Sequence, residues 1–195
     1  MRHPVAARVI AMLAFSLAAM GSWAETVVMP NGLSVELPEG WSLKGSPQGM
    51  LEKSGLRRVQ FVCETEACEQ TQETCTILMR NESLPGEDDA DKLREYYASP
   101  FKRYFRLRAV LRSTGPDADI RQPLELVRIG DREWYRVETD ARHNYRSGVF
   151  AETVVNGRYV GGICKSCETG EERHLGGMRI LMSLKSRGAL GDDAE

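Results

Sequence analysis

Apolar and polar residues alternate along the first part of the chain as they do in short strands. Residues 33–37 place Leu, Val and Leu on one side and Ser and Glu on the other, the period of a half-buried strand. Pro30-Asn31-Gly32 has the composition of a tight turn and joins them to an apolar run at residues 27–29. Two more strands are predicted over residues 56–63 and 76–80.

The apolar period changes to that of a helix over residues 88–105. The side chains that form its single stripe are Leu93, Tyr97, Phe101 and Tyr104. Asp88 and Asp89 stand where a helix favours a capping carboxylate. Pro100 interrupts the stripe, so either the helix kinks there or Ser99 caps a second short helix.

Strand patterns return in the second half of the chain, around two turn sequences, Gly130-Asp131-Arg132 and Asn156-Gly157. The strands of these hairpins are residues 126–129 with 134–137 and residues 148–155 with 158–164. A closing helix is expected over residues 171–184, where Gly176-Gly177 either weakens the helix or marks its close packing on a sheet. Because tight turns join only antiparallel strands, the order of elements predicts an α+β fold, a single antiparallel sheet with helices packed on its faces.

The N-terminal residues have the pattern of a secretory signal peptide. Arg2 and Arg8 precede an apolar run at residues 9–20, and small residues follow at positions 21–24. The run is shorter than the ~20 residues that span a bilayer, so we expect cleavage after Ala24 and no stable membrane insertion. This predicts a periplasmic or secreted protein with one domain over residues 25–185 and a disordered tail at residues 186–195.

Four stretches of the chain together resemble the PsbP-like family: LSVELPEGW, IGDREWYRVE, VVNGRYVGGI and MRILMSLK. That family includes the extrinsic photosystem subunit, a Ran-binding nuclear import factor and bacterial envelope and secretion-associated proteins. The resemblance implies an antiparallel sheet with flanking helices and a function in binding other proteins, and it brings no catalytic centre with it. The five cysteines and the loop at residues 64–74 depart from the family pattern.

Five cysteines follow the predicted cleavage point: Cys63, Cys68, Cys75, Cys164 and Cys167. In an oxidising compartment, disulfides are the expected state of such residues. We predict a Cys63–Cys75 bond across the mouth of a hairpin. Cys164 then pairs with Cys167, or one of these two pairs with Cys68, and one thiol is left over.

The Cys-Lys-Ser-Cys sequence at residues 164–167 has three other interpretations. Haem attachment requires a histidine after the second cysteine, and Glu168 stands there instead. A zinc site with His174 has unsuitable cysteine spacing. A redox-active pair is the main rival to a structural disulfide, although the predicted helix begins too late for its dipole to activate Cys164.

Five cations without an acid among them lie close together in the sequence: Lys102, Arg103, Arg106, Arg108 and Arg112. The alternation at residues 106–110 suggests that the helix gives way to a strand there, with the arginines on one side. The cluster is either a docking surface for an acidic partner or anionic lipid head groups, or simply the solvated face of these elements. The chain as a whole has a formal net charge of −2, which argues against nucleic acid as a partner.

No catalytic or metal-binding set emerges from the remaining residues. Asp140 and His143 could pair in a polar loop, but no serine occupies the setting of a hydrolase nucleophile. The acidic residues 87–91 lack the glycine of a calcium loop. The sequence therefore predicts a non-enzymatic periplasmic protein-binding module without cofactor, with a thiol–disulfide enzyme using Cys164 and Cys167 as the alternative and a hydrolase as a third option.

Overall fold

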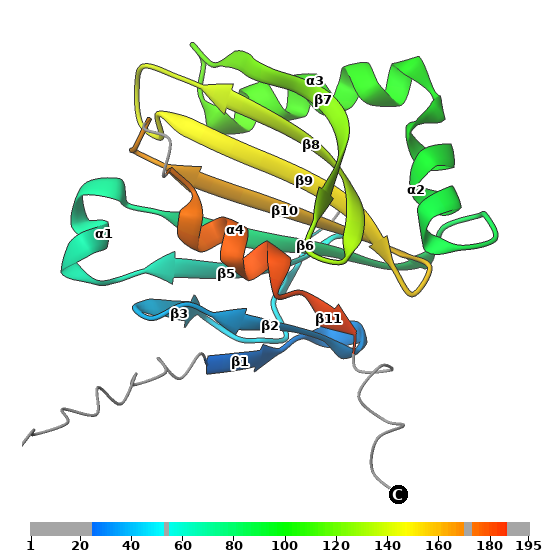
Figure 1. Ribbon diagram of the computed structural model, residues 1–195, viewed down its shortest axis with the longest axis horizontal. Helices are drawn as coiled ribbons and strands as arrows, with labels where there is room; N and C mark the ends of the chain where they lie inside the picture. Colours follow the sequence, from blue (N-terminus) through cyan, green and yellow to red (C-terminus); the bar gives the residue numbers. More distant parts are fainter. Residues whose placement is uncertain (1–24, 53–54, 170–172, 187–195) are drawn as a thin grey trace, which may run out of the picture.

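A computed structural model describes residues 25–52, 55–169 and 173–186 (Figure 1). Within this part the strands form two antiparallel sheets. The smaller has the order β1-β2-β11, with β1 at Glu25–Val28, β2 at Leu33–Leu37 and β11 at Lys185–Ser186. The larger has the order β3-β5-β6-β10-β9-β8-β7, and a short strand, β4, also pairs with β5.

The strands of the larger sheet are β3 (Trp41–Lys44), β4 (Met50–Leu51), β5 (Arg57–Cys63), β6 (Thr74–Ser83), β7 (Asp119–Ile129), β8 (Arg132–Asp140), β9 (Ser147–Val155) and β10 (Arg158–Ser166). Both predicted hairpins of the second half are present, as β7–β8 and β9–β10. At the β9–β10 turn, Asn156 and Gly157 have φ of 52° and 74°, the positive values that this tight turn requires.

The predicted helix of residues 88–105 is two helices that meet at the proline. Helix α2 spans Asp89–Ala98, and the Asp88 side chain caps it by accepting from the Asp91 amide at 2.8 Å. Ser99 is extended and Pro100 begins α3, which continues to Thr114. The strand expected at residues 106–110 is therefore wrong, because this segment continues α3. A further short helix, α1 (Glu66–Thr71), lies in the predicted loop.

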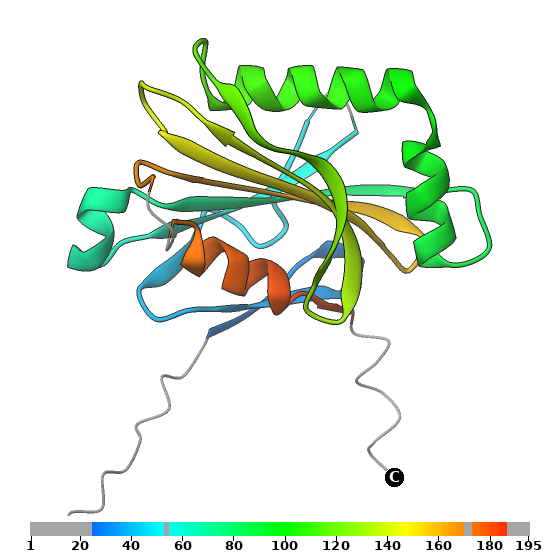
Figure 2. The same ribbon diagram turned by 45° about the horizontal axis from the view of Figure 1, so that its top comes forward.

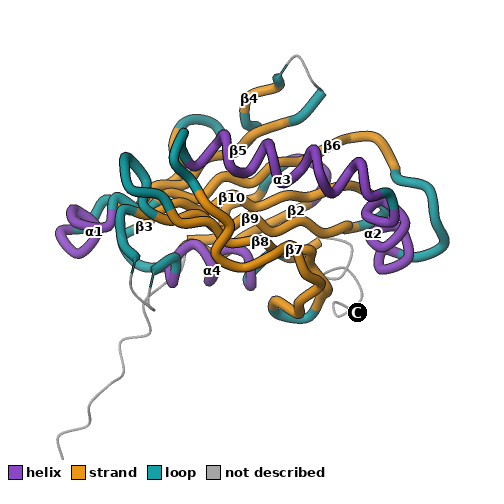
Figure 3. Tube along the Cα trace, turned by 90° about the horizontal axis from the view of Figure 1, so that it is seen from above, coloured by secondary structure: helices purple, strands orange, loops and turns teal. Residues whose placement is uncertain are grey.

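The helices divide between the two faces of the larger sheet. Helices α2 and α3 cover one face, and α4 (Leu175–Met182) lies against the other (Figures 2 and 3). Adjacent residues of β9 show the alternation. Phe150 packs with Val110 of α3, whereas Ala151 belongs to the core cluster that contains Ile180 of α4. We call these two sides the α3 face and the α4 face.

The main core lies on the α4 face, between the larger sheet, α4 and the smaller sheet. Its largest fully buried side chains include Trp134, Phe61 and Met79. Glycines permit the close contact of α4 with β10. A Cβ on Gly177 would lie 2.7 Å from Cys164 Cβ, and one on Gly162 would lie 2.3 Å from a Leu181 methyl carbon. The Gly176-Gly177 pair thus marks close packing of the helix on the sheet.

Several predicted boundaries are corrected or lie beyond the described chain. The expected single sheet is two sheets, because the first hairpin pairs with the C-terminal strand β11 and not with the larger sheet. Helix α4 begins at residue 175, and Ser186 of the predicted tail belongs to β11. The predicted signal peptide (residues 1–24) and residues 187–195 lie outside the described residues. Among the described residues, no helix is long and apolar enough to cross a membrane.

Candidate functional site

Helix α3 presents an exposed aromatic surface at its N-terminal end. Its first six residues, 100–105, are all exposed. Three of them are aromatic, and Phe101, Tyr104 and Phe105 keep 75%, 53% and 65% of their surface in solvent. Their i, i+3, i+4 spacing places the rings together on one side of the helix, and we call this group the aromatic stripe of α3.

The five predicted cations all lie on α3 and fall into two groups. Arg103, which is exposed, and Arg106, which is half-buried, both bond to other elements of the protein. Arg103 Nε donates to the Tyr97 carbonyl at 2.6 Å, at the C-terminal end of α2. Arg106 Nε lies 2.8 Å from Glu152 Oε1 on the sheet below. These two arginines therefore hold α3 in place and are poor contributors to a docking surface.

Lys102, Arg108 and Arg112 remain on the outside of α3. The Lys102 ammonium lies 4.6 Å from the centre of the Tyr96 ring. Arg108 donates to the Tyr104 hydroxyl at 3.2 Å, with its guanidinium 5.7 Å from the centre of that ring. Arg112 makes no ion pair with any described residue. The outer surface of α3 thus combines cations with the aromatic stripe, and the helix contains no acid.

A buried polar cluster lies beneath α3. Glu152 of β9 and Tyr159 of β10 are both buried, and the Tyr159 hydroxyl donates to Glu152. Arg106 completes the cluster from above. Burial raises the pKa of Glu152 to about 8, against the hydrogen bond from Tyr159 and the charge of Arg80. This anchor was not predicted, although Glu152 is a lone carboxylate in the apolar run of residues 149–155 and was its signal in the sequence.

The cysteines pair differently from the prediction. Cys63 is bonded to Cys68, and Cys75 is bonded to Cys164. The predicted Cys63–Cys75 bond is wrong because the register of β5 with β6 sets Phe61 opposite Cys75. Helix α1 follows β5 directly and returns Cys68 to Cys63.

Cys164 reaches Cys75 because β6 and β10 are neighbours and the two cysteines are directly opposite each other. Both expected alternatives for the remaining cysteines are wrong. Cys164 does not pair with Cys167 because it is bonded to Cys75, and neither of them pairs with Cys68 because Cys68 is bonded to Cys63. The thiol–disulfide hypothesis therefore loses the pair of cysteines on which it rested.

Cys167 is the free cysteine that the odd number predicted. Its Sγ lies 3.5 Å from the Asn144 carbonyl oxygen. It borders a cavity of about 550 Å³ together with Arg112 and Lys165. Lys165 Nζ donates to the Ser113 carbonyl at 2.5 Å, and burial lowers the pKa of this lysine. A lone thiol in this position supplies no second cysteine for exchange.

The histidines form no catalytic pair with the predicted partner. His143 Nδ1 lies 3.0 Å from Asp117 and not beside Asp140, whose carboxylate accepts from Arg173 at 3.3 Å. His174 is buried at the start of α4. Within the described residues, no three His, Cys, Asp or Glu side chains gather as metal ligands.

Comparison with known proteins adds information about the fold. No protein-family model matches the chain. No curated protein matches it either. A crystal structure from Bacteroides thetaiotaomicron aligns over 85% of this chain with a TM-score of 0.51 and 11% identity, and this chain spans about half (49%) of that one.

The solution structure of cyanobacterial PsbP from Synechocystis aligns over 88% of this chain and 97% of its own, with a TM-score of 0.47 and 16% identity. The solved structures similar to this chain thus include a PsbP. At this identity the likeness concerns the fold alone.

Proposed function

We propose that the chain is a non-enzymatic protein-binding module of the periplasm or the extracellular space, and that α3 docks a partner protein with an acidic surface. The observation that carries the proposal is the outer surface of α3. There the aromatic stripe lies in solvent beside Lys102, Arg108 and Arg112, on a helix without an acid. Aromatic residues and arginine are the residue types that most often dominate the energy of protein interfaces.

The chemistry of the cations favours a protein over a lipid surface. Two of the three outer cations, Arg108 and Arg112, are arginines, whose planar guanidinium binds a carboxylate through two parallel hydrogen bonds. Arg108 is held over the Tyr104 ring, so less side-chain freedom is lost when it binds. A helix that lies in a membrane needs a broad apolar face, whereas α3 exposes only a short stripe at one end.

The proposed compartment has its own support. Two disulfides persist in oxidising environments such as the periplasm. The N-terminal pattern of positive, apolar and small residues is that of a secretory signal peptide. Both observations favour a location outside the cytoplasm, so we expect the partner protein to be there as well.

The test is site-specific photo-crosslinking in cells, with a benzophenone amino acid at Phe105. We expect one discrete crosslinked protein, whose yield falls at least tenfold when Arg108→Glu and Arg112→Glu are combined. A matched variant, Lys44→Glu with Arg128→Glu, reverses two exposed cations elsewhere and leaves the yield unchanged. Arg103 and Arg106 are left intact, because reversing them would disturb the seating of α3.

The binding of purified protein to vesicles of phosphatidylglycerol is the second arm of this experiment. Strong vesicle binding that depends on Arg108 and Arg112, without a protein crosslink, would replace the protein partner by an anionic membrane. A crosslink that is insensitive to both reversals would refute the role of the cationic surface.

A further inference from the structure

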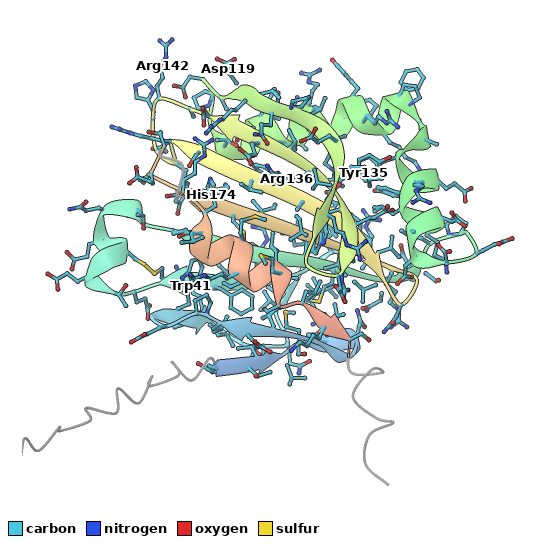
Figure 4. All side chains as sticks on the ribbon, in the orientation of Figure 1. Trp41, Asp119, Tyr135, Arg136, Arg142 and His174 are labelled. Atoms are coloured by element: carbon cyan, nitrogen blue, oxygen red, sulfur yellow. A yellow bond between two sulfur atoms is a disulfide. The ribbon has the colours of Figure 1, made fainter. Side chains whose placement is uncertain are left out.

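A second cavity lies on the α4 face, away from the docking surface of α3. It has a volume of about 310 Å³ and opens between β7, β8 and the first turn of α4. Its lining includes Arg136, Glu138, Arg173, His174, Leu175 and Met178. Figure 4 shows Arg136 on the sheet and His174 at the start of α4, both on the α4 face.

His174 is the most unusual residue of this cavity. Only 1% of its surface is exposed, and neither Nδ1 nor Nε2 has a hydrogen-bond partner among the described residues. Its backbone is left-handed, with φ of 63°, at the position just before α4. Burial lowers its pKa to about 4, so the ring is neutral at physiological pH and offers one donor and one acceptor. Buried polar groups without a partner are rare in native proteins.

Arg136 supplies the second unsatisfied group. One terminal nitrogen donates to both Gln122 Oε1 and Glu138 Oε1 at 2.6 Å, which fixes the position of the guanidinium. Its Nε is buried without a hydrogen-bond partner. Eight buried side-chain atoms lack a partner among the described residues, and three of them belong to these two residues of one cavity.

The charges and apolar groups of the lining define the kind of ligand that fits. Three guanidinium groups, of Arg121, Arg136 and Arg173, face one carboxylate, that of Glu138, and Arg173 also pairs with Asp140 outside the lining. The apolar part of the wall is formed by Val149, Leu175 and Met178, and Gln122 completes the lining. The volume is at the small end for ligand sites. A cation would be repelled, and a pure hydrocarbon would leave the buried donors unmatched.

We propose that this cavity binds a small carboxylic acid. The carboxylate accepts hydrogen bonds from Arg136 Nε and from the ring N–H of His174, and a short aliphatic tail packs on Leu175 and Met178. The ligand satisfies donors that the fold itself leaves unpaired. This inference is independent of the proposed docking function, because it concerns the opposite face of the sheet.

The test is a titration of the full chain with butyrate, followed by NMR of the histidine rings. We expect a saturable shift of the His174 ring signals, while the exposed His143 ring is the internal control and does not move. Butylamine and butanol, which match the tail without the carboxylate, produce no saturable shift. The absence of a shift with butyrate, or an equal shift with butylamine, would refute the proposal.

Variants separate binding from folding. His174→Phe keeps a buried ring, Arg136→Met removes the guanidinium, and each weakens butyrate binding about tenfold or more in calorimetry. Arg128→Met, on the neighbouring strand outside the cavity, leaves the affinity unchanged. Because Leu175 is 50% exposed, Leu175→Trp covers the opening at little cost to folding and abolishes binding. Undiminished binding in Leu175→Trp would place the acid elsewhere and overturn the proposal.

The same carboxylate chemistry occurs in a free acid and at the C-terminus of a peptide. Competition between butyrate and acetyl-alanyl-valine distinguishes the two sources. Displacement of butyrate by the peptide identifies a chain terminus as the natural ligand, and failure to displace it identifies a free small acid.

Discussion

The two faces of the larger sheet each bury a titratable side chain, and the two side chains differ in their hydrogen-bond partners. On the α3 face, Glu152 Oε1 accepts from Tyr159 and pairs with Arg106, and only Oε2 of this carboxylate lacks a partner among the described residues. On the α4 face, the ring nitrogens of His174 have no partner among the described residues. A partnered buried group anchors one element to another, whereas an unpartnered one marks a position where a ligand can contribute the missing contact.

Helices α4 and α3, which cover these two faces, also differ in how closely they pack on the sheet. Helix α4 packs through glycine contacts against the buried Cys75–Cys164 bond. Helix α3 leaves its first six residues exposed and is held at that end by Arg103 and Arg106. We infer from this difference that the α4 face contributes most of the free energy of unfolding, and that the α3 face has surface free to bind a partner.

The largest effect should come from the disulfide of the α4 face. Replacing Cys75 and Cys164 together by alanine opens a loop of 89 residues and should lower the free energy of unfolding by about 4 kcal/mol. Replacing Cys63 and Cys68 together by serine opens a loop of 5 residues and should cost about 2 kcal/mol. Urea unfolding without reductant measures both, and equal losses would contradict the assignment of stability to the α4 face.

Arg106 and Arg108 provide the next comparison, because they lie two residues apart on α3. Arg106→Met removes the cation beside the buried Glu152 and should lower the free energy of unfolding by about 2 kcal/mol. This loss is smaller than for a fully buried pair, because the Arg106 side chain is partly exposed and solvent screens its charge. Arg108→Met removes an exposed cation and should change stability by less than ~0.5 kcal/mol. Thermal and urea unfolding of the two variants would disprove the anchoring role if their losses were similar.

The pH dependence of stability should have opposite signs on the two faces. The pKa of Glu152 is raised from 4.5 in the unfolded chain to about 8, so the folded state binds more protons between these values. Stability from this group is therefore present at low pH and lost as the pH rises, by about 2 kcal/mol between pH 6 and pH 8. Glu152→Gln should remove this decline. Urea unfolding at several pH values tests it, and identical slopes in both proteins would refute the raised pKa.

His174 should show the reverse dependence with a somewhat smaller effect. Its pKa falls from 6.5 in the unfolded chain to about 4 in the fold, so the unfolded state binds more protons between these values. Stability is then present above pH 6.5 and should fall by about 1.5 kcal/mol from pH 6.5 to pH 5. In His174→Phe this acid-side loss should disappear, and NMR titration of the ring gives an independent reading of the pKa. A ring that titrates near 6.5 would show that it is not buried in the neutral form.

Local signals made much of the fold predictable. Asn156-Gly157 located a hairpin with its turn, and Asp88 and Pro100 located the starts of two helices. The alternation of apolar and polar residues at positions 106–110 led to the wrong prediction of a strand. There Leu107, Val110 and Leu111 also fit the helical period, and the contact of Val110 with Phe150 is made in the helix. Short patterns that fit both periods are decided by tertiary packing.

The parts that could not be predicted depend on long-range register. The sequence contains both halves of the Cys75–Cys164 pair, but nothing local reveals that β6 and β10 are neighbours. The cations of α3 were found as a group. Their division into anchors and surface residues required the position of Glu152 beneath the helix. His174 was considered only as a metal ligand, because its burial is invisible in the sequence.

The spacing of the two disulfides also sets the order in which they can form during synthesis. Cys63 and Cys68 emerge within a few residues of each other and can close at once through α1. Cys75 must stay reduced until 89 further residues have been made, since its partner lies in β10. Early closure of the first bond removes the two nearest competitors of Cys75. The short disulfide thereby protects the correct pairing of the long one, which gives a half-exposed loop bond a role in assembly that its small contribution to stability does not reveal.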